Sequence, residues 1–114
     1  MFFCDLIAKA GKALEKESGG GAAFCEVDLL KEKPIVRWIQ GVAKKWGNIH
    51  ILINNAARDP RIAFDSMTVE QWDELFACNL RAYFITSQAA VRWMRQGASI
   101  VNLASITFHN SQIG

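Results

Sequence analysis

Hydrophobic residues along the chain alternate between short continuous runs and stripes with helical spacing. The continuous runs cover residues 2–4, 22–29, 49–53 and 99–103, and each has the length of a buried strand. Between the runs, apolar residues recur every three to four positions, as on one face of a helix. Strands that alternate with helices are typical of a parallel α/β sheet. We therefore predict an α/β fold with four strands in this chain.

The first helix is predicted in the segment LIAKAGKALEKE, because it is rich in Ala, Leu, Lys and Glu. Ser18-Gly19-Gly20-Gly21 follows it and reads as a helix stop. A glycine run can also cradle a phosphate, but such a loop follows a strand and opens a helix. This one follows a helix and opens a strand, so we interpret it as a turn.

Two further helices are predicted from their starts and their apolar stripes. The second begins at Pro34 and ends at Gly47-Asn48, with one face formed by Ile35, Ile39, Val42, Ala43 and Trp46. The third begins with a capping box of Thr68 and Gln71 and extends for about 40 Å as one helix. Its apolar stripe consists of Trp72, Leu75, Phe76, Leu80, Tyr83, Phe84, Ser87, Ala90, Val91 and Met94.

Composition narrows the class of protein. A chain of 114 residues supports one modest domain, and 51% hydrophobic residues with a net charge of +2 argue against disorder and against a nucleic-acid partner. No apolar run approaches the roughly 18 residues of a membrane span, so we expect no membrane partner. The acid at position 5 comes too early for a signal peptide. We expect a soluble cytoplasmic protein.

The three cysteines, Cys4, Cys25 and Cys78, lie far apart in the sequence and are odd in number. No CxxC pair is present, which makes a disulfide framework or a zinc site improbable. His50 and His109 could serve as acid/base groups, but surface roles are the more common use of such residues. We expect no metal site.

Polar residues follow the apolar runs where a parallel sheet would place a ligand. Asp5 closes the first run, Asp28 the second, Asn54-Asn55 the third, and Ser105 follows the fourth. In doubly wound sheets ligands bind beyond the carboxyl ends of the strands. Any one of these residues alone is more commonly a cap or a turn residue. Four of them at equivalent positions predict a binding site.

The motif Asn54-Asn55-Ala56-Ala57 at the end of the third run resembles the NNAG motif of the short-chain dehydrogenase/reductase family, although Ala57 replaces the usual Gly. The resemblance covers essentially the whole chain. It implies a partial Rossmann-like doubly wound parallel sheet over residues 1–114, containing family strands 2 to 5. It also implies cofactor contacts from Asp5, Asp28, Leu29, Asn55 and Ala56. Asp5 would bind the adenosine ribose, which favours NAD over NADP because a carboxylate repels a 2′-phosphate.

Asn79 and Ser105 are the catalytic residues that the resemblance implies. Asn79 lies among apolar residues of the third helix, where an unpaired amide would cost on the order of 1–3 kcal/mol, so it needs partners there. A core Asn satisfied by neighbouring backbone is the alternative to a catalytic Asn that holds a proton-relay water. Ser105 in ASIVNLAS matches the serine that orients the reacting carbonyl or hydroxyl.

Two parts of the family's machinery have no counterpart in these residues. The Gly-rich turn precedes the ribose-binding acid by about 20 residues, and four residues precede Asp5. The catalytic YxxxK pair is also absent, since the only tyrosine, Tyr83, is followed four residues later by Ser87. We therefore expect a truncated segment that is inactive alone. In the strand order 3-2-1-4-5-6 the central strand is omitted, which predicts two half sheets with a gap, or a nonnative closure.

Three functions are compatible with this sequence pattern. The first is an NAD-dependent oxidoreductase that transfers hydride between nicotinamide and a secondary alcohol or ketone, with a homodimeric or homotetrameric parent implied by the resemblance. The second is a nonenzymatic truncated member or pseudoenzyme that acts in binding or oligomer contact. The third, a flavodoxin-like or receiver-type domain, explains the alternation of elements but leaves the NNAA motif and Asn79 unexplained.

Overall fold

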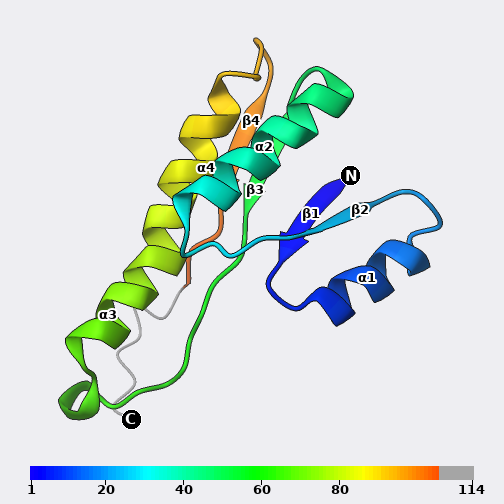
Figure 1. The fold of residues 1–114 in the computed structure, drawn as a ribbon. Coiled ribbons are helices and arrows are strands. Elements are labelled where there is room, and N and C mark those ends of the chain that lie inside the picture. The colour runs from blue at the N-terminus through cyan, green and yellow to red at the C-terminus, as the bar shows by residue number, and fades with distance from the viewer. Residues whose placement is uncertain (106–114) are drawn as a thin grey trace.

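The computed structural model describes residues 1–105, which form a layered α/β arrangement (Figure 1). Their elements, in chain order, are β1 (Phe2–Asp5), α1 (Ala8–Glu17), β2 (Ala23–Glu26), α2 (Glu32–Trp46), β3 (Ile51–Asn54), a 3₁₀ turn (Phe64–Ser66), α3 (Val69–Phe76), a π-helical segment (Ala77–Arg81), α4 (Ala82–Val91) and β4 (Ser99–Asn102). All four predicted strands are present. The α/β fold class is confirmed.

The strands of the described residues form two separate parallel pairs. β1 pairs with β2, and β3 pairs with β4. Figure 1 shows β1 lying between β2 and β3, so the break falls in the middle of the strand order. The predicted gap between two half sheets is therefore present in the described residues, and the alternative of nonnative closure is wrong.

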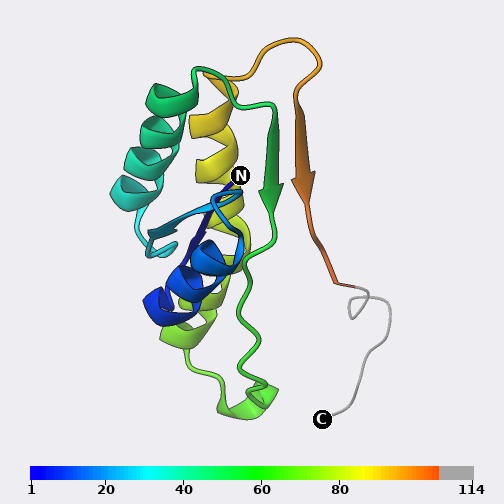
Figure 2. The ribbon, with the colours of Figure 1, turned by 90° about the vertical axis from the view of Figure 1, so that its right-hand side faces the viewer.

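A layer of two helices covers one face of β3 and β4 (Figure 2). Helix α2 packs against α4, and two buried clusters lie beneath them. One cluster consists of Ile39, Ala43, Ile49, Leu52 and Ala90, and the other of Val27, Ile35, Ala82 and Ile85. Trp38 of α2 packs against both clusters. The helix layer therefore connects the two half sheets that the strands leave separate.

The glycine run is a turn, as predicted. Helix α1 ends at Glu17, and Gly19 and Gly20 follow with φ of 58° and 91°, a left-handed conformation that glycine adopts without steric cost. Ser18 stabilises the turn, because its hydroxyl donates to the Glu15 carbonyl at 2.6 Å and accepts from the Ala22 amide at 3.0 Å. The chain then enters β2.

Three details of the predicted helices were wrong. Helix α2 begins at Glu32 rather than Pro34, so Pro34 lies inside the first turn. Trp46 is 63% exposed and contacts the Phe2 ring edge-on at 5.4 Å instead of joining the core. The long third helix is divided by the π-helical segment, although its capping box is present, with the Thr68 hydroxyl accepting from the Gln71 amide at 3.2 Å.

The buried face of the third helix also differs from the predicted stripe. Of the predicted stripe, Ala90 is buried as expected, but Trp72, Phe76, Leu80, Phe84 and Val91 are exposed. Four buried residues of this helix lie outside the predicted stripe: Cys78, Ala82, Ile85 and Thr86. The helix is apolar on two sides, so hydrophobic spacing could not decide which side faces the sheet. Small residues occupy the side that packs against α2 and β3, because they allow close approach of the backbones.

Candidate functional site at the carboxyl ends of the strands

The carboxyl ends of the strands lie on one side of the molecule (Figures 1 and 2). Within each half sheet the strands are parallel and in register, so Asp5 lies opposite Glu26 and Asn54 opposite Asn102. The loops that follow β1, β2, β3 and β4 carry the predicted polar residues. Within each half sheet the structure therefore brings the two strand ends together, and ligands of open α/β sheets bind beyond such ends.

The two asparagines of the NNAA motif occupy different environments. Asn54 is buried, at 5% exposure, and its side chain joins β3 to two other elements. Its carbonyl oxygen accepts from the Thr86 hydroxyl at 2.7 Å, and its amide donates to Asn102 Oδ1 at 2.8 Å and to Ser87 Oγ at 3.2 Å. Asn54 is thus a structural residue that fixes β4 and α4 to the end of β3.

Asn55 is exposed, and Ala56 is half-buried, in the loop that follows Asn54. Strand side chains alternate between faces, so burial of Asn54 turns Asn55 away from the helix layer. An exposed amide just after the end of β3 can contact a ligand without first breaking an internal hydrogen bond of the core. The doubled asparagine therefore combines one internal anchor with one outward polar group.

Asn79 forms a two-point contact with the backbone of Arg58. Its Oδ1 accepts from the Arg58 N–H at 2.8 Å, and its Nδ2 donates to the Arg58 carbonyl at 2.9 Å. An ion pair of the Arg58 guanidinium with Glu74 at 3.0 Å adds a second link between the same loop and helix α3. The predicted need for partners at Asn79 is met by neighbouring backbone, and the contact fixes the loop after β3 to the helix.

The π-helical segment places Asn79 in a widened turn. The Ala82 amide donates to the Ala77 carbonyl, five residues back, instead of four. Such single π turns occur frequently at functional sites, since they rotate the following side chains relative to the preceding helix. Here the rotation is inserted at the residue that holds the NNAA loop. Sequence periodicity gave no indication of this turn.

Asp5 and Asp28 both accept local backbone hydrogen bonds. Asp5 is exposed, and its Oδ1 accepts from the Ile7 amide at 2.8 Å. The Asp28 carboxylate accepts from the Leu30 amide at 3.0 Å and pairs with Lys31 at 3.0 Å. The Leu30 amide and then Lys31 hold the pKa of Asp28 below its ordinary value. Asp28 therefore stabilises the turn into α2, and Leu29 beside it is half-buried against the core.

Ser105 lies in the exposed segment after β4. The Leu103 amide donates to the Asn54 carbonyl at 2.9 Å, so the segment that leads to Ser105 leaves the sheet beside the NNAA motif. His109 lies outside the described residues, and His50 is exposed at the start of β3. Burial raises the pKa of the hydroxyl of Tyr83, the only tyrosine of the chain, so this side chain is a weaker acid than an ordinary tyrosine.

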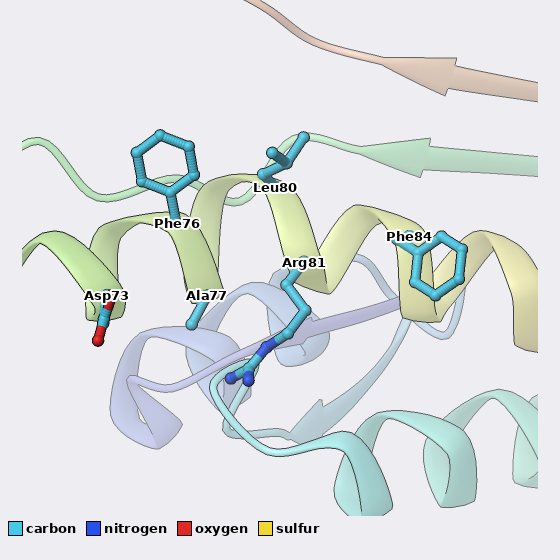
Figure 3. A pocket seen from close by; sticks show the side chains of 6 residues that line it. All are labelled: Asp73, Phe76, Ala77, Leu80, Arg81 and Phe84. Atoms are coloured by element: carbon cyan, nitrogen blue, oxygen red, sulfur yellow. The ribbon is translucent and has the colours of Figure 1, made fainter.

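An open apolar hollow of about 490 Å³ lies on the exposed side of the long helix (Figure 3). It is lined by Asp73, Phe76, Ala77, Leu80, Arg81 and Phe84. Arg81 leaves this surface toward the loop after β2, where its Nη2 donates to the Leu30 carbonyl at 2.9 Å. None of the predicted site residues lines the hollow, so it is separate from the strand-end site.

The sequence analysis did not identify the hydrogen-bond partners of Asn54 and Asn79. Thr86, Ser87 and Asn102 complete the contacts of Asn54, and the Arg58 backbone completes those of Asn79. A signal was present for Thr86, because it is a hydroxyl residue in an otherwise apolar helical stretch. No sequence signal points to Arg58, since only its backbone atoms bind Asn79.

Parallel strands joined by helices, with polar side chains at their carboxyl ends, are typical of the doubly wound α/β class. A family model described as enoyl-(acyl carrier protein) reductase matches residues 1–112. The chain belongs to the short-chain dehydrogenase/reductase family. Within the part that the structure describes, no helix is long and apolar enough to cross a membrane.

Curated relatives carry dehydrogenase names. A probable galactose dehydrogenase of Rhizobium meliloti is 38% identical over an alignment of 112 residues, which covers 93% of this chain and 44% of that protein. A sorbitol dehydrogenase of Cereibacter sphaeroides is 33% identical, over 89% of this chain and 41% of the relative. The chain thus spans less than half the length of these relatives.

Solved structures share the fold. A short-chain dehydrogenase of Burkholderia cenocepacia in complex with NADP superposes with a TM-score of 0.91 at 23% identity, covering 97% of this chain and 47% of the other. A Serratia marcescens short-chain dehydrogenase/reductase variant gives a TM-score of 0.90 at 23% identity, over 99% of this chain and 48% of the other. At these identities the likeness establishes the arrangement of the elements.

Proposed function

We propose that residues 1–114 form the adenosine-binding side and part of the catalytic site of an NAD-dependent oxidoreductase. The observation that carries this proposal is the clamp between Asn79 and the Arg58 backbone, which fixes the loop after Asn55 at the carboxyl end of β3. A loop that served only to reverse the chain direction would not need to be held by Asn79, which lies 21 positions after Arg58. Membership of the family and the dehydrogenase names of its relatives support the reaction class.

The nicotinamide cofactor fits the strand-end residues. Asp5 offers an exposed carboxylate after β1, and Asn55 an exposed amide after β3. In this proposal Asp5 accepts hydrogen bonds from the adenosine ribose, Asp28 and Leu29 adjoin the adenine, and Asn55 and Ala56 contact the adenosine side. The bound nicotinamide would supply the hydride chemistry. We propose a preference for NAD, since the Asp5 carboxylate would repel a 2′-phosphate.

The catalytic roles proposed for this chain are orientation and water positioning. The Ser105 hydroxyl would donate to the reacting oxygen of a secondary alcohol or ketone, and Asn79 would position a water at the widened helical turn. The names of the relatives, which include galactose, sorbitol and xylose dehydrogenases, favour a sugar or sugar alcohol as substrate. A second copy of the protein would cover the exposed apolar side of the long helix in a homodimer or homotetramer.

We propose that residues 1–114 alone lack turnover. For this reason a nonenzymatic binding role is the second candidate function. Neither Asn79 nor Ser105 can replace an activated tyrosine as proton donor near neutral pH. Tyr83 cannot do so either, because burial raises its pKa and Ser87 stands where a lysine would be needed. The chain would then bind the adenosine part of the cofactor without reacting.

The test compares residues 1–114 with a protein extended by its coding sequence on both sides. Both are assayed by nicotinamide absorbance against sugars, sugar alcohols and simple ketones, with NAD and NADP. We expect turnover only from the extended protein, with NAD preferred and with Ser105→Ala reducing kcat more than cofactor affinity. Robust turnover by residues 1–114 would refute the inactive-segment proposal. Equal efficiency with NADP would refute the role of Asp5.

A further inference from the structure

Cys4 and Cys25 are direct neighbours in the sheet, although 20 residues separate them in the sequence. They are Cα partners in the register of the parallel pair β1 and β2. Directly opposed residues of adjacent strands project from the same face, and the strands lie roughly 4.8 Å apart. A disulfide forms between Cα atoms about 4.4–6.8 Å apart, so the pair lies within bonding range.

The two thiols differ in access. Cys25 is exposed on β2, whereas Cys4 is half-buried and packs against the cluster of Val27 and Ile35. Burial, and then the neighbouring Cys25 and Asp5, raises the pKa of the Cys4 thiol to about 12. An external reagent would therefore meet Cys25 first and Cys4 second.

We propose that Cys4 and Cys25 are a site of reversible oxidation, forming an internal disulfide on reaction with a small-molecule disulfide such as oxidised glutathione. The Cys25 thiolate attacks one sulfur of the reagent and expels one glutathione thiolate. The Cys4 thiol then loses its proton, attacks the Cys25 sulfur of the mixed disulfide, and expels the second glutathione. Two protein thiols are oxidised, and one glutathione disulfide is reduced to two thiols.

The sheet geometry makes this bond reversible. The spacing of about 4.8 Å between neighbouring strands exceeds the Cβ–Cβ separation of about 3.8 Å in a relaxed disulfide, so we expect this bond to be strained. Strained disulfides are reduced more readily by thiols. Because Asp5 follows Cys4 directly, the bond would form next to the end of β1. The inference concerns the thiols of this chain and stands independently of the proposed oxidoreductase function.

The experiment treats residues 1–114 with excess oxidised glutathione, blocks remaining thiols, and determines intact mass and a non-reducing peptide map. We expect loss of two of the three titratable thiols and a cross-linked peptide pair containing Cys4 and Cys25, both restored by dithiothreitol. Cys4→Ser should instead retain glutathione on Cys25. The matched control, Cys78→Ser, should form the same cross-link, since Cys78 is buried in the π-helical segment.

Two results would overturn the proposal. The first is a wild-type chain that keeps three free thiols or holds glutathione on Cys25 without progressing to the internal bond. The second is a yield of the Cys4–Cys25 disulfide that is no larger in buffer than in concentrated urea. In urea the chain is unfolded, so cysteines pair according to their separation in the sequence. If the fold brings Cys4 and Cys25 together, the yield of their disulfide must be higher in buffer than in urea. A poorly folded preparation would give equal yields and would therefore also count against the proposal.

Discussion

Replacing Asn54 with Ala is expected to destabilise the chain strongly. The change removes three side-chain hydrogen bonds, to Thr86, Asn102 and Ser87, at a residue that is 5% exposed. At about 1 kcal/mol for each bond, with an added cost for the partners left in the interior, the free energy of unfolding should fall by about 2–4 kcal/mol. A small domain with an m value of about 1.5 kcal/mol/M would lose roughly 2 M in its urea midpoint.

Urea unfolding followed by tryptophan fluorescence and far-ultraviolet circular dichroism measures this loss, and Asn55→Ala is the matched control. Asn55 has the same side chain one position later but is exposed, so its replacement should change the unfolding free energy by less than about 0.5 kcal/mol. Thr86→Val should also destabilise, and the double variant with Asn54→Ala should be non-additive because the pair shares a 2.7 Å bond. Equal effects at positions 54 and 55 would refute the assignment of Asn54 as the anchor.

Three further predictions concern local contacts. Asn79→Ala should speed proteolysis in the loop around Arg58, because both bonds of the clamp are lost; an unchanged cleavage rate would contradict the clamp. The lowered pKa of Asp28 means that its carboxylate stabilises the fold above the ordinary carboxyl pKa, and that this stabilisation is lost as the pH falls through the lowered pKa. Asp28→Asn should therefore lower the free energy of unfolding by about 0.2–1 kcal/mol at neutral pH and leave it unchanged in strong acid. Urea unfolding at several pH values measures both. Thr68→Ala should cost about 1 kcal/mol through loss of the α3 cap, whereas Thr68→Ser should retain most of it in the same assay.

The order of elements was predictable because short apolar runs and helical stripes alternate clearly along this chain. The glycine turn after α1 and the Thr68 capping box were identified from local chemistry, which depends on residues a few positions apart. The gap between half sheets was predictable from the strand order of the family. Each of these features is encoded either locally or in the succession of strands.

Features that depend on contacts between elements distant in the sequence could not be predicted. Helix residues 69–91 are apolar on two sides, and the choice of the buried side rests on close approach to α2 and β3. The π turn at Asn79 and the clamp to Arg58 involve backbone atoms, which carry no residue signature. The position of Cys4 opposite Cys25 depends on strand register, so sequence distance alone could not show that the two residues are neighbours.

The helix layer has a consequence for how this molecule responds to strain. Backbone hydrogen bonds tie strands rigidly at a fixed spacing, but β1–β2 and β3–β4 are separate sheets in the described residues and Trp38 packs against the cores of both. The spacing between the pairs is therefore set by side-chain volume in α2, which is softer than a hydrogen-bonded ladder. Slow opening motions should concentrate there, and amide protons of β1 and β3 should exchange in two independent groups with separate opening free energies.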